Sequence, residues 1–309
     1  MVRRARLASL IATAQPPLWR APAVCDPSTV DEWGPERIGD LVSLTDAALA
    51  DEHLTADELL TCCWEDGGVV LGTDDGSAAV SVVVRGAGQL AAAFVKLVVV
   101  HPDRRRQGLG RSLLRAAEGW AWDRGAADLH LSGSAPAYLW PGVDVRFTAM
   151  LCLAEADGYE DTGAAFDMSV PAAFRHPAPD GVELRRTLSD EDVGAVDAFV
   201  AREWPNWVAE QRRAVEQGTC LAAFDSSTGE AVAFACHSVN RAGWFGPTGT
   251  APAYRHRSIG LALLGEVCTD LMVAGFSDVE ICWIGPIGFY AAAGGVISRC
   301  YRTSRRRKS

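Results

Sequence analysis

The sequence lacks several features that would assign it to a protein class at once. No apolar run in its 309 residues reaches about 18, the length that spans a bilayer, so we predict no membrane-spanning helix. Its nine cysteines are scattered without a Cys-x-x-Cys pair, which argues against a disulfide framework and against a zinc site. The net charge of −10 disfavours an extensive contact with nucleic acid, whose phosphates attract basic surfaces. We therefore expect a cytoplasmic protein without a bound metal.

The length allows two domains, because one domain typically has about 100–200 residues. Residues 171–181 contain three prolines and form the best candidate linker. The start of the chain resembles a secretory signal only faintly, because its apolar stretch is short. We expect an N-terminal arm at 1–30, a first domain at 31–172, a linker at 173–181, a second domain at 182–304 and a disordered basic tail at 305–309.

Two segments of the chain, residues 100–114 and 250–264, repeat each other. Pro102 and Pro252, Arg105 and Arg255, Gly110 and Gly260, and Leu113 and Leu263 are all separated by 150 positions. A β-rich run precedes each segment, and an amphipathic helix that stops near a glycine follows each. The constant offset predicts a duplicated fold.

The hydrophobic pattern predicts similar elements in both halves. In the first half we expect helices at 36–49, 54–64 and 146–156, and strands at 68–72, 78–84, 90–100, 128–132 and 162–170. In the second half we expect helices at 189–203, 206–216 and 286–293, and strands at 182–187, 219–225, 230–239, 243–250, 278–283 and 295–303.

Each repeated segment is a loop that opens a helix. Gly108 and Gly110 leave the backbone uncovered, the helix N-terminus adds positive potential, and Arg105 and Arg106 add charge. A phosphate or pyrophosphate is the expected ligand. The segment is not a Walker loop, because no Gly-Lys-Ser/Thr follows, and it is not the dinucleotide fingerprint, because Gly-x-Gly-x-x-Gly is absent. A glycine turn with solvated arginines is the alternative, and two copies in register disfavour it.

On these residues the sequence resembles the GNAT N-acyltransferase superfamily, whose Arg/Gln-x-x-Gly-x-Gly/Ala loop binds the pyrophosphate of acyl-CoA. The resemblance is closest to the tandem arrangement of mycothiol-synthase-like proteins. It implies an α/β fold with two tandem GNAT-type domains, each a twisted mixed sheet flanked by helices, and acetyl-CoA or another acyl-CoA as the cofactor. The residues implied to bind it are Val98, Val99, Val100, Arg105, Arg106, Gln107, Gly108, Leu109 and Gly110 in the first half and Thr248, Gly249, Thr250, Arg255, His256, Arg257, Ser258, Ile259 and Gly260 in the second.

The two halves differ at the residue expected to protonate the leaving thiolate. The family's Phe-Tyr pair matches Phe289 and Tyr290, which implies Tyr290 as the general acid. The residue 150 positions earlier is Trp140, whose indole cannot act as an acid, although nearby Tyr138 could substitute. We therefore expect catalysis in the C-terminal domain. CoA binding there should be weakened by Ser258, and the N-terminal domain should be structural or bind CoA without turnover.

Other residues are candidates for handling the amine. Glu280 and His237 could accept its proton, or each could be an ordinary strand residue. Glu203, Trp204 and Trp207 fall in the segment that borders the acceptor groove in this superfamily. Aromatic walls with an acidic residue suit an amine, and packing of the tryptophans against the sheet is the alternative.

We expect an acyl-CoA-dependent N-acetyltransferase that acts on a primary amine of a small molecule, as a monomer or homodimer and without a membrane partner. Two alternatives stay open. The same fold could take its acyl group from aminoacyl-tRNA, with the basic residues at 305–308 touching the RNA. The protein could also bind acyl-CoA without turnover, because Trp140 and Ser258 both depart from the family pattern.

Overall fold

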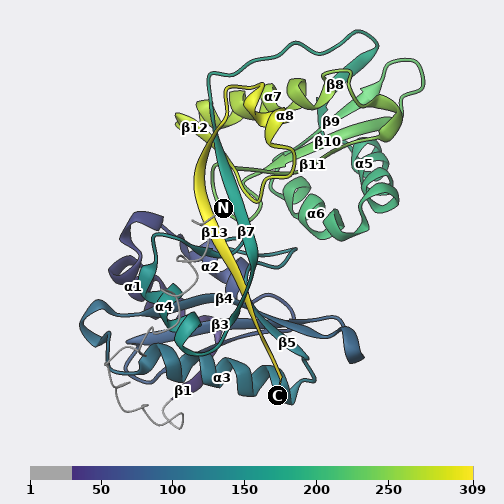
Figure 1. Ribbon diagram of the computed structural model, residues 1–309. Coiled ribbons are helices and arrows are strands. Elements are labelled where there is room, and N and C mark those ends of the chain that lie inside the picture. Colours follow the sequence, from purple (N-terminus) through teal and green to yellow (C-terminus); the bar gives the residue numbers. More distant parts are fainter. Residues whose placement is uncertain (1–29, 309) are drawn as a thin grey trace, which may run out of the picture.

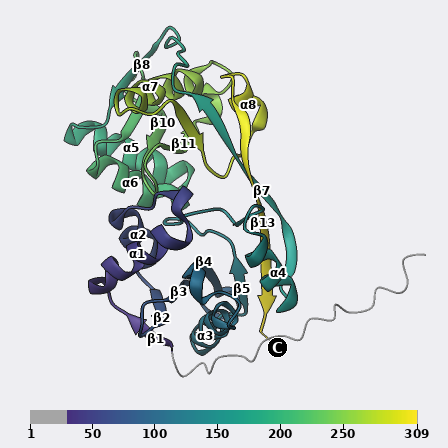
Figure 2. The ribbon, with the colours of Figure 1, turned by 90° about the vertical axis from the view of Figure 1, so that its left-hand side faces the viewer.

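The computed structural model describes residues 30–308 (Figure 1). All but the last residue of the arm expected at 1–30 therefore lies outside the described residues. The described chain forms two halves, which two long strands join side by side (Figures 1 and 2). Among the described residues, no helix combines the length and the apolar character that a bilayer crossing requires.

The N-terminal half is a mixed sheet with helices on both faces. Its elements are β1 Val30–Trp33, α1 Ile38–Ala48, α2 Ala56–Cys63, β2 Gly68–Thr73, β3 Ala78–Arg85, β4 Ala92–Val100, α3 Leu109–Asp123, β5 Asp128–Leu131, β6 Val143–Asp144, α4 Thr148–Ala156 and β7 Glu160–Pro171. Strands β1 to β4 are antiparallel neighbours, and β4 runs parallel to β5. One core packs α1 and α2 around Leu41 and Leu59, and a second packs α3 and α4 around Leu113.

The C-terminal half repeats this arrangement. Its elements are β8 Val182–Arg186, α5 Asp190–Glu203, α6 Val208–Glu216, β9 Cys220–Asp225, β10 Ala231–His237, β11 Trp244–Thr250, α7 Ile259–Val273, β12 Asp278–Ile281, α8 Ile287–Ala291 and β13 Val296–Arg307. Strands β8 to β11 are antiparallel neighbours, and β11 runs parallel to β12. Helices α5 and α6 cover the core around Phe199, and α7 and α8 cover the core around Leu263.

The two halves exchange their last strands. Strand β7 leaves the N-terminal half and pairs with β12, while β13 leaves the C-terminal half and pairs with β5. Because β7 and β13 also pair with each other, all strands belong to one sheet, in the order β1-β2-β3-β4-β5-β13-β7-β12-β11-β10-β9-β8, with β6 added beside β13. Strand β13, from the C-terminal part of the chain, therefore completes the sheet of the N-terminal half.

The basic tail is part of this exchange, and its expected disorder is wrong. Arg305, Arg306 and Arg307 pair in register with His130, Leu129 and Asp128 of β5. Ion pairs to Glu160, Glu118 and Asp128 offset the charge of these three arginines. This run of like charges is ordered because it pairs with the open edge of β5 and because nearby carboxylates neutralise its arginines.

The predicted helices and strands otherwise coincide with the observed ones to within a few residues. Strands β1 and β6 were not predicted, because four and two residues give too short a pattern. Helix α8 is shorter than expected and spans only Ile287–Ala291. The predicted linker, residues 173–181, lies between β7 and β8 and contains no helix or strand.

Candidate functional site

The loop before α3 has the geometry of an anion site. A short 3-10 turn, Pro102–Arg104, leads into it, and Arg106 and Gly108 both adopt left-handed backbone conformations, with φ of 64° and 91°. No side chain caps the first turn of α3. The amides at the start of this helix are thus free to meet a ligand, and the helix dipole favours a negative one.

The matching loop before α7 has the same conformation. A 3-10 turn at Pro252–Tyr254 is followed by His256 and Ser258 with φ of 62° and 60°, and α7 also begins without a side-chain cap. Ser258 therefore takes the backbone conformation of Gly108, which an L-residue adopts at a cost of about 1–2 kcal/mol.

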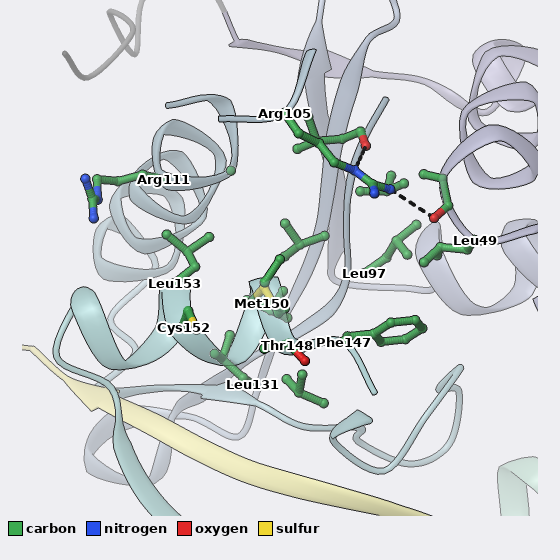
Figure 3. Close-up of a pocket in the computed structure, with 18 of the residues that line it drawn as sticks. Leu49, Leu97, Arg105, Arg111, Leu131, Phe147, Thr148, Met150, Cys152 and Leu153 are labelled. Carbon is green, nitrogen blue, oxygen red and sulfur yellow. Dashed lines mark hydrogen bonds between the residues drawn. The ribbon is translucent and has the colours of Figure 1, made fainter. Parts of the chain in front are cut away.

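The two loop arginines hold the loop in place. Arg105 donates from Nε to the carbonyl of Val100, 3.3 Å away, and from Nη2 to the carbonyl of Ala48, 3.1 Å away (Figure 3). Arg255 donates in the same way from Nε to the carbonyl of Thr250 at 3.2 Å. Both side chains are committed to the end of the preceding strand, so they shape the loop rather than reach for a ligand.

The charge available at the first loop comes from Arg106. Arg104 pairs with Asp75 at 2.7 Å, and Arg111 pairs with Asp157 at 2.7 Å, its side chain pointing away from the labelled wall residues in Figure 3. Arg106 makes no hydrogen bond or ion pair within the described part of the chain. Arg106 lies beside the uncapped start of α3, where both its charge and the helix dipole would stabilise a bound anion.

This loop forms one end of a cavity of about 740 Å³ in the N-terminal half. The cavity is bounded by β4, the end of β5, α3 and α4, and most of its wall is apolar. Met150 and Leu153 of α4 face Leu97 of β4 across it (Figure 3). The described residues that line it include Leu49, Val95, Leu97, Val98, Val99, Val100, Arg104, Arg105, Arg106, Gly108, Leu109, Gly110, Leu131, Trp140, Arg146, Phe147, Thr148, Met150, Cys152 and Leu153.

The cavity opens where two parallel strands separate. Pairing between β4 and β5 covers only Ala92 to Phe94 and ends at His130, whereas β4 stays paired with β3 up to Val100. The backbone of residues 98–100, predicted to bind the cofactor, therefore borders the cavity on its side away from β3. Such an edge offers amides and carbonyls to an extended ligand.

The corresponding space in the C-terminal half is filled differently. Strands β11 and β12 also separate, after Phe245 and Ile281. The ring of Trp204 lies directly against Gly249, because a Cβ added there would be 2.5 Å from the Trp204 Cη2. Trp204 caps α5 as Leu49 caps α1, since each backbone amide bonds to a carbonyl of its own helix at 2.7 Å. Trp204 packed on Gly249 thus takes the place that Leu49 and Val99 have in the first half.

The three residues predicted to border the acceptor groove pack within the C-terminal half. Trp204 and Trp207 stack with ring centroids 5.7 Å apart and adjoin Phe199 and Phe234. Glu203 accepts a hydrogen bond from Arg202 at 3.0 Å. The tryptophans thus belong to an aromatic cluster over β10.

The structure does not bring the three predicted catalytic residues together. His237 lies on β10 and contacts Asp270 of α7 at 3.2 Å, and Arg186 also binds that aspartate. Burial lowers the pKa of His237 despite this carboxylate. Asp270 is eleven residues along α7 from Ile259, so His237 lies about 16 Å from the anion loop.

Glu280 and Tyr290 lie on opposite faces of the sheet. Val279 and Ile281 share a core with Tyr290, so Glu280 between them points to the other face. Glu280 accepts a hydrogen bond from Ser298 at 2.6 Å, and burial raises its pKa.

Tyr290 packs against Phe245 and Phe289 and is 6% exposed, and burial raises its pKa. No described residue hydrogen-bonds to its hydroxyl.

The counterpart of Tyr290 in the first half is Ala154, and the inferred match with Trp140 is wrong. The carbonyls of Ala154 and Tyr290 both accept the amide five residues later, each at 2.9 Å. Leu153 and Phe289 match in the same way, because they lie 3.1 Å from a Cβ added at Gly110 and at Gly260. The first half has a longer connection before this helix, which includes β6 and shifts the offset from 150 to 136.

Trp140, expected to match Tyr290, and Tyr138, its possible substitute, both make contacts away from Ala154. Trp140 donates its indole N–H to Glu52 at 3.2 Å. Tyr138 packs against Trp244 and Trp283 of the other half, with ring centroids 6.0 and 5.4 Å away.

Sequence reasoning missed the cavity wall formed by α4 and the residues just before it. Arg146, Phe147, Thr148, Met150 and Cys152 all line the cavity. A signal was present, because Leu153-Ala154 followed by Gly158 has the spacing of Phe289-Tyr290 followed by Gly294. This match does not appear at an offset of 150, because the longer connection before α4 changes the offset.

Residues 29–137 match the model of the acetyltransferase (GNAT) family. No curated protein matches the chain. A GCN5-related N-acetyltransferase from Sphaerobacter thermophilus is 22% identical, with a TM-score of 0.65 over 90% of this chain and 95% of that one. A tandem GNAT protein from the clavulanic acid biosynthesis pathway is 17% identical, with a TM-score of 0.68 over 90% of this chain and 98% of that one.

A third solved structure is longer than this chain. It contains the glucosamine N-acetyltransferase region of a fungal multi-domain GH3 beta-N-acetylglucosaminidase, is 17% identical and has a TM-score of 0.72. The match covers 90% of this chain but only 38% of that one. At these identities the similarity concerns the fold, and it extends over both halves.

Proposed function

We propose that this protein transfers an acyl group, with acetyl as the expected one, from coenzyme A to the primary amine of a small molecule, because residues 29–137 match the model of the acetyltransferase (GNAT) family. We further propose that the donor binds in the N-terminal cavity. The observation that carries the proposal is the cavity itself, which joins an uncapped helix N-terminus to the gap between β4 and β5.

The residues present fit such a donor. The pyrophosphate would lie at the start of α3 beside Arg106, where free amides and positive charge meet. The uncharged pantetheine arm of coenzyme A would follow residues 98–100 between the separated strands β4 and β5, against the apolar side chains of α4. A volume of about 740 Å³ lies within the range of about 300–1,000 Å³ that ligand pockets occupy.

Transfer at this position requires little acid catalysis from the protein. The amine nitrogen attacks the thioester carbon, a C–N bond forms and the C–S bond breaks. A thiol has a pKa near 8.5, so its thiolate leaves readily and takes up the amine's proton through water. Backbone amides of β4 can stabilise the negative oxygen that develops on the carbonyl. Ala154 at the tyrosine position therefore does not prevent catalysis in the N-terminal half.

A second location for catalysis is the one that the sequence predicts. Tyr290 occupies the position of the family's general acid in the C-terminal half, and its hydroxyl has no hydrogen-bond partner among residues 30–308. The ring of Trp204 on Gly249 and the cavity of about 740 Å³ in the other half favour the N-terminal location.

The test counts donor molecules and measures turnover. Native mass spectrometry with acetyl-CoA should show one bound molecule per chain, and thiol release with a panel of primary amines should show transfer. No bound acetyl-CoA would overturn the proposal. Binding without release on any amine would favour a non-catalytic acyl-CoA-binding protein, and activity only with aminoacyl-tRNA would favour that donor.

A further inference from the structure

Five charged residues from both halves meet beside the N-terminal cavity, at the end away from the phosphate loop. We name Glu52, Asp144, Arg146, Arg241 and Arg299 the Arg146 cluster. Glu52 accepts hydrogen bonds from Arg299 at 2.7 Å, Arg241 at 3.2 Å and Arg146 at 3.3 Å. Asp144 accepts from Arg146 at 2.8 Å and from Arg299 at 2.9 Å. The C-terminal half thus supplies two of the three arginines.

Within the Arg146 cluster, the guanidinium groups outnumber the carboxylates. Glu52 and Asp144 are 6% and 2% exposed, and hydrogen bonds from the arginines outweigh burial and lower the pKa of each, so both are ionised. Three guanidinium groups therefore face two carboxylates. Asp167 interacts electrostatically with Arg299, and Glu280 does so with Arg299 and Arg241. Asp167 accepts hydrogen bonds from the Tyr301 hydroxyl and the Trp283 amide, and Glu280 accepts one from Ser298.

Arg146 is the member of the cluster that is accessible to a ligand in the cavity. Its side chain is 59% exposed and lines the cavity, whereas those of Arg241 and Arg299 are 11% and 15% exposed. Its Nε and Nη2 bond to the cluster's carboxylates, and its Nη1 has no partner within the described part of the chain.

The start of α4 adds to the positive potential at this end of the cavity. Helix α4 begins at Thr148 without a side-chain cap or an acidic residue in its first turn. Ala149 lines the cavity, and its amide has no acceptor among residues 30–308. The neighbouring amides of the first turn already donate to the carbonyls of Arg146 and Phe147. Since Leu153 touches the start of α3, the other end of α4 lies about 8 Å further along. Phe147 and Thr148 lie across Met150 from Arg105 in Figure 3. This positive region is therefore separate from the phosphate loop.

We propose that this end of the cavity binds a carboxylate of one of the two substrates, held by Arg146 Nη1 and the first turn of α4. The inference rests on the proposed function, because it assigns a ligand group to the same cavity. The carboxylate has two possible sources. It is carried either by the amine acceptor, as in an α-amino acid, or by the acyl group of the donor, as in malonyl-CoA or succinyl-CoA.

The first experiment uses the unaltered protein with matched probes. One arm compares α-amino acids with their C-terminal amides as acceptors of acetyl-CoA, and the other compares the Kd of succinyl-CoA and malonyl-CoA with that of acetyl-CoA. We expect at least a tenfold preference for the charged probe in one arm, the lower range for a hydrogen bond to a charged group. Absence of a preference in both arms, including no turnover of any amino acid, would overturn the inference.

The second experiment assigns the preference to Arg146. Arg146→Gln should abolish the preference of whichever arm shows it, while Arg146→Lys should keep part of it. Arg302→Gln is the matched control, because Arg302 pairs with Glu155 and Asp161 and does not line the cavity. A preference that survives in a folded Arg146→Gln would overturn the inference. Failure of the unaltered protein to bind acetyl-CoA would instead overturn the proposed function.

Discussion

A pair of equivalent substitutions can locate the donor. Gly108 and Ser258 occupy the same left-handed position before α3 and α7, so glutamate at either places a carboxylate beside one helix N-terminus and leaves the other unchanged. If the donor binds in the N-terminal cavity, only Gly108→Glu should weaken it. Ser258→Glu is then the matched control for charge and for backbone conformation.

The magnitude follows from Coulomb's law. A carboxylate about 5 Å from one phosphate charge, at an effective dielectric constant of about 20, costs about 3 kcal/mol, or about 200-fold in affinity. Salt screens part of this at an exposed loop, so we expect a loss of about 30-fold or more for Gly108→Glu. Ser258→Glu should change the Kd by less than about threefold.

Isothermal titration with acetyl-CoA measures both variants, and thiol release measures turnover in parallel. Gly108→Asn controls for side-chain bulk and strain, because asparagine tolerates the left-handed region without adding charge. Unchanged binding in Gly108→Glu together with loss in Ser258→Glu would refute our reasoning. It would return the donor to the C-terminal half, as the sequence predicts.

Four further predictions test other parts of the structure. Tyr290→Phe should keep turnover within threefold in a steady-state assay, because its counterpart in the catalytic half is Ala154, and a tenfold loss would place catalysis in the C-terminal half. Gly249→Val should lower the free energy of unfolding by about 1–3 kcal/mol in chemical unfolding, because its Cβ meets Trp204 at 2.5 Å. Adding Trp204→Leu should restore part of this stability. Additive losses of stability from the two substitutions would contradict this packing. Removing residues 303–309 should abolish acetyl-CoA binding and lower the Tm, because β5 loses its antiparallel partner β13 and keeps only β4, whereas removing 308–309 should not. An intact Tm after the longer deletion would disprove this dependence. Burial raises the pKa of Glu210 from 4.5 to about 7, so its contribution to stability is full below pH 4.5 and is lost as the pH rises through 7. Glu210→Gln should therefore flatten the fall in Tm between pH 5 and 8. An unchanged slope of Tm against pH would argue against this role of Glu210.

Local patterns in the sequence were sufficient for the elements and for one end of the site. Periodicity located the helices and strands because it depends on residues a few positions apart. The repeat around Gly110 and Gly260 identified two loops that share one backbone conformation. Ser258 could be recognised as a substitute for Gly108, because both precede the same helix at the same offset.

Tertiary structure alone decided which half has the large cavity and what surrounds it. Leu49 and Val99 line the cavity in one half, whereas Trp204 packs on Gly249 in the other, and each pair joins residues that are far apart in sequence. The exchange of β7 and β13 depends on which strand edge each reaches, and no local pattern encodes that choice. This exchange carries Arg299 to Glu52, 247 residues away, so that one half of the chain supplies charge at the cavity of the other.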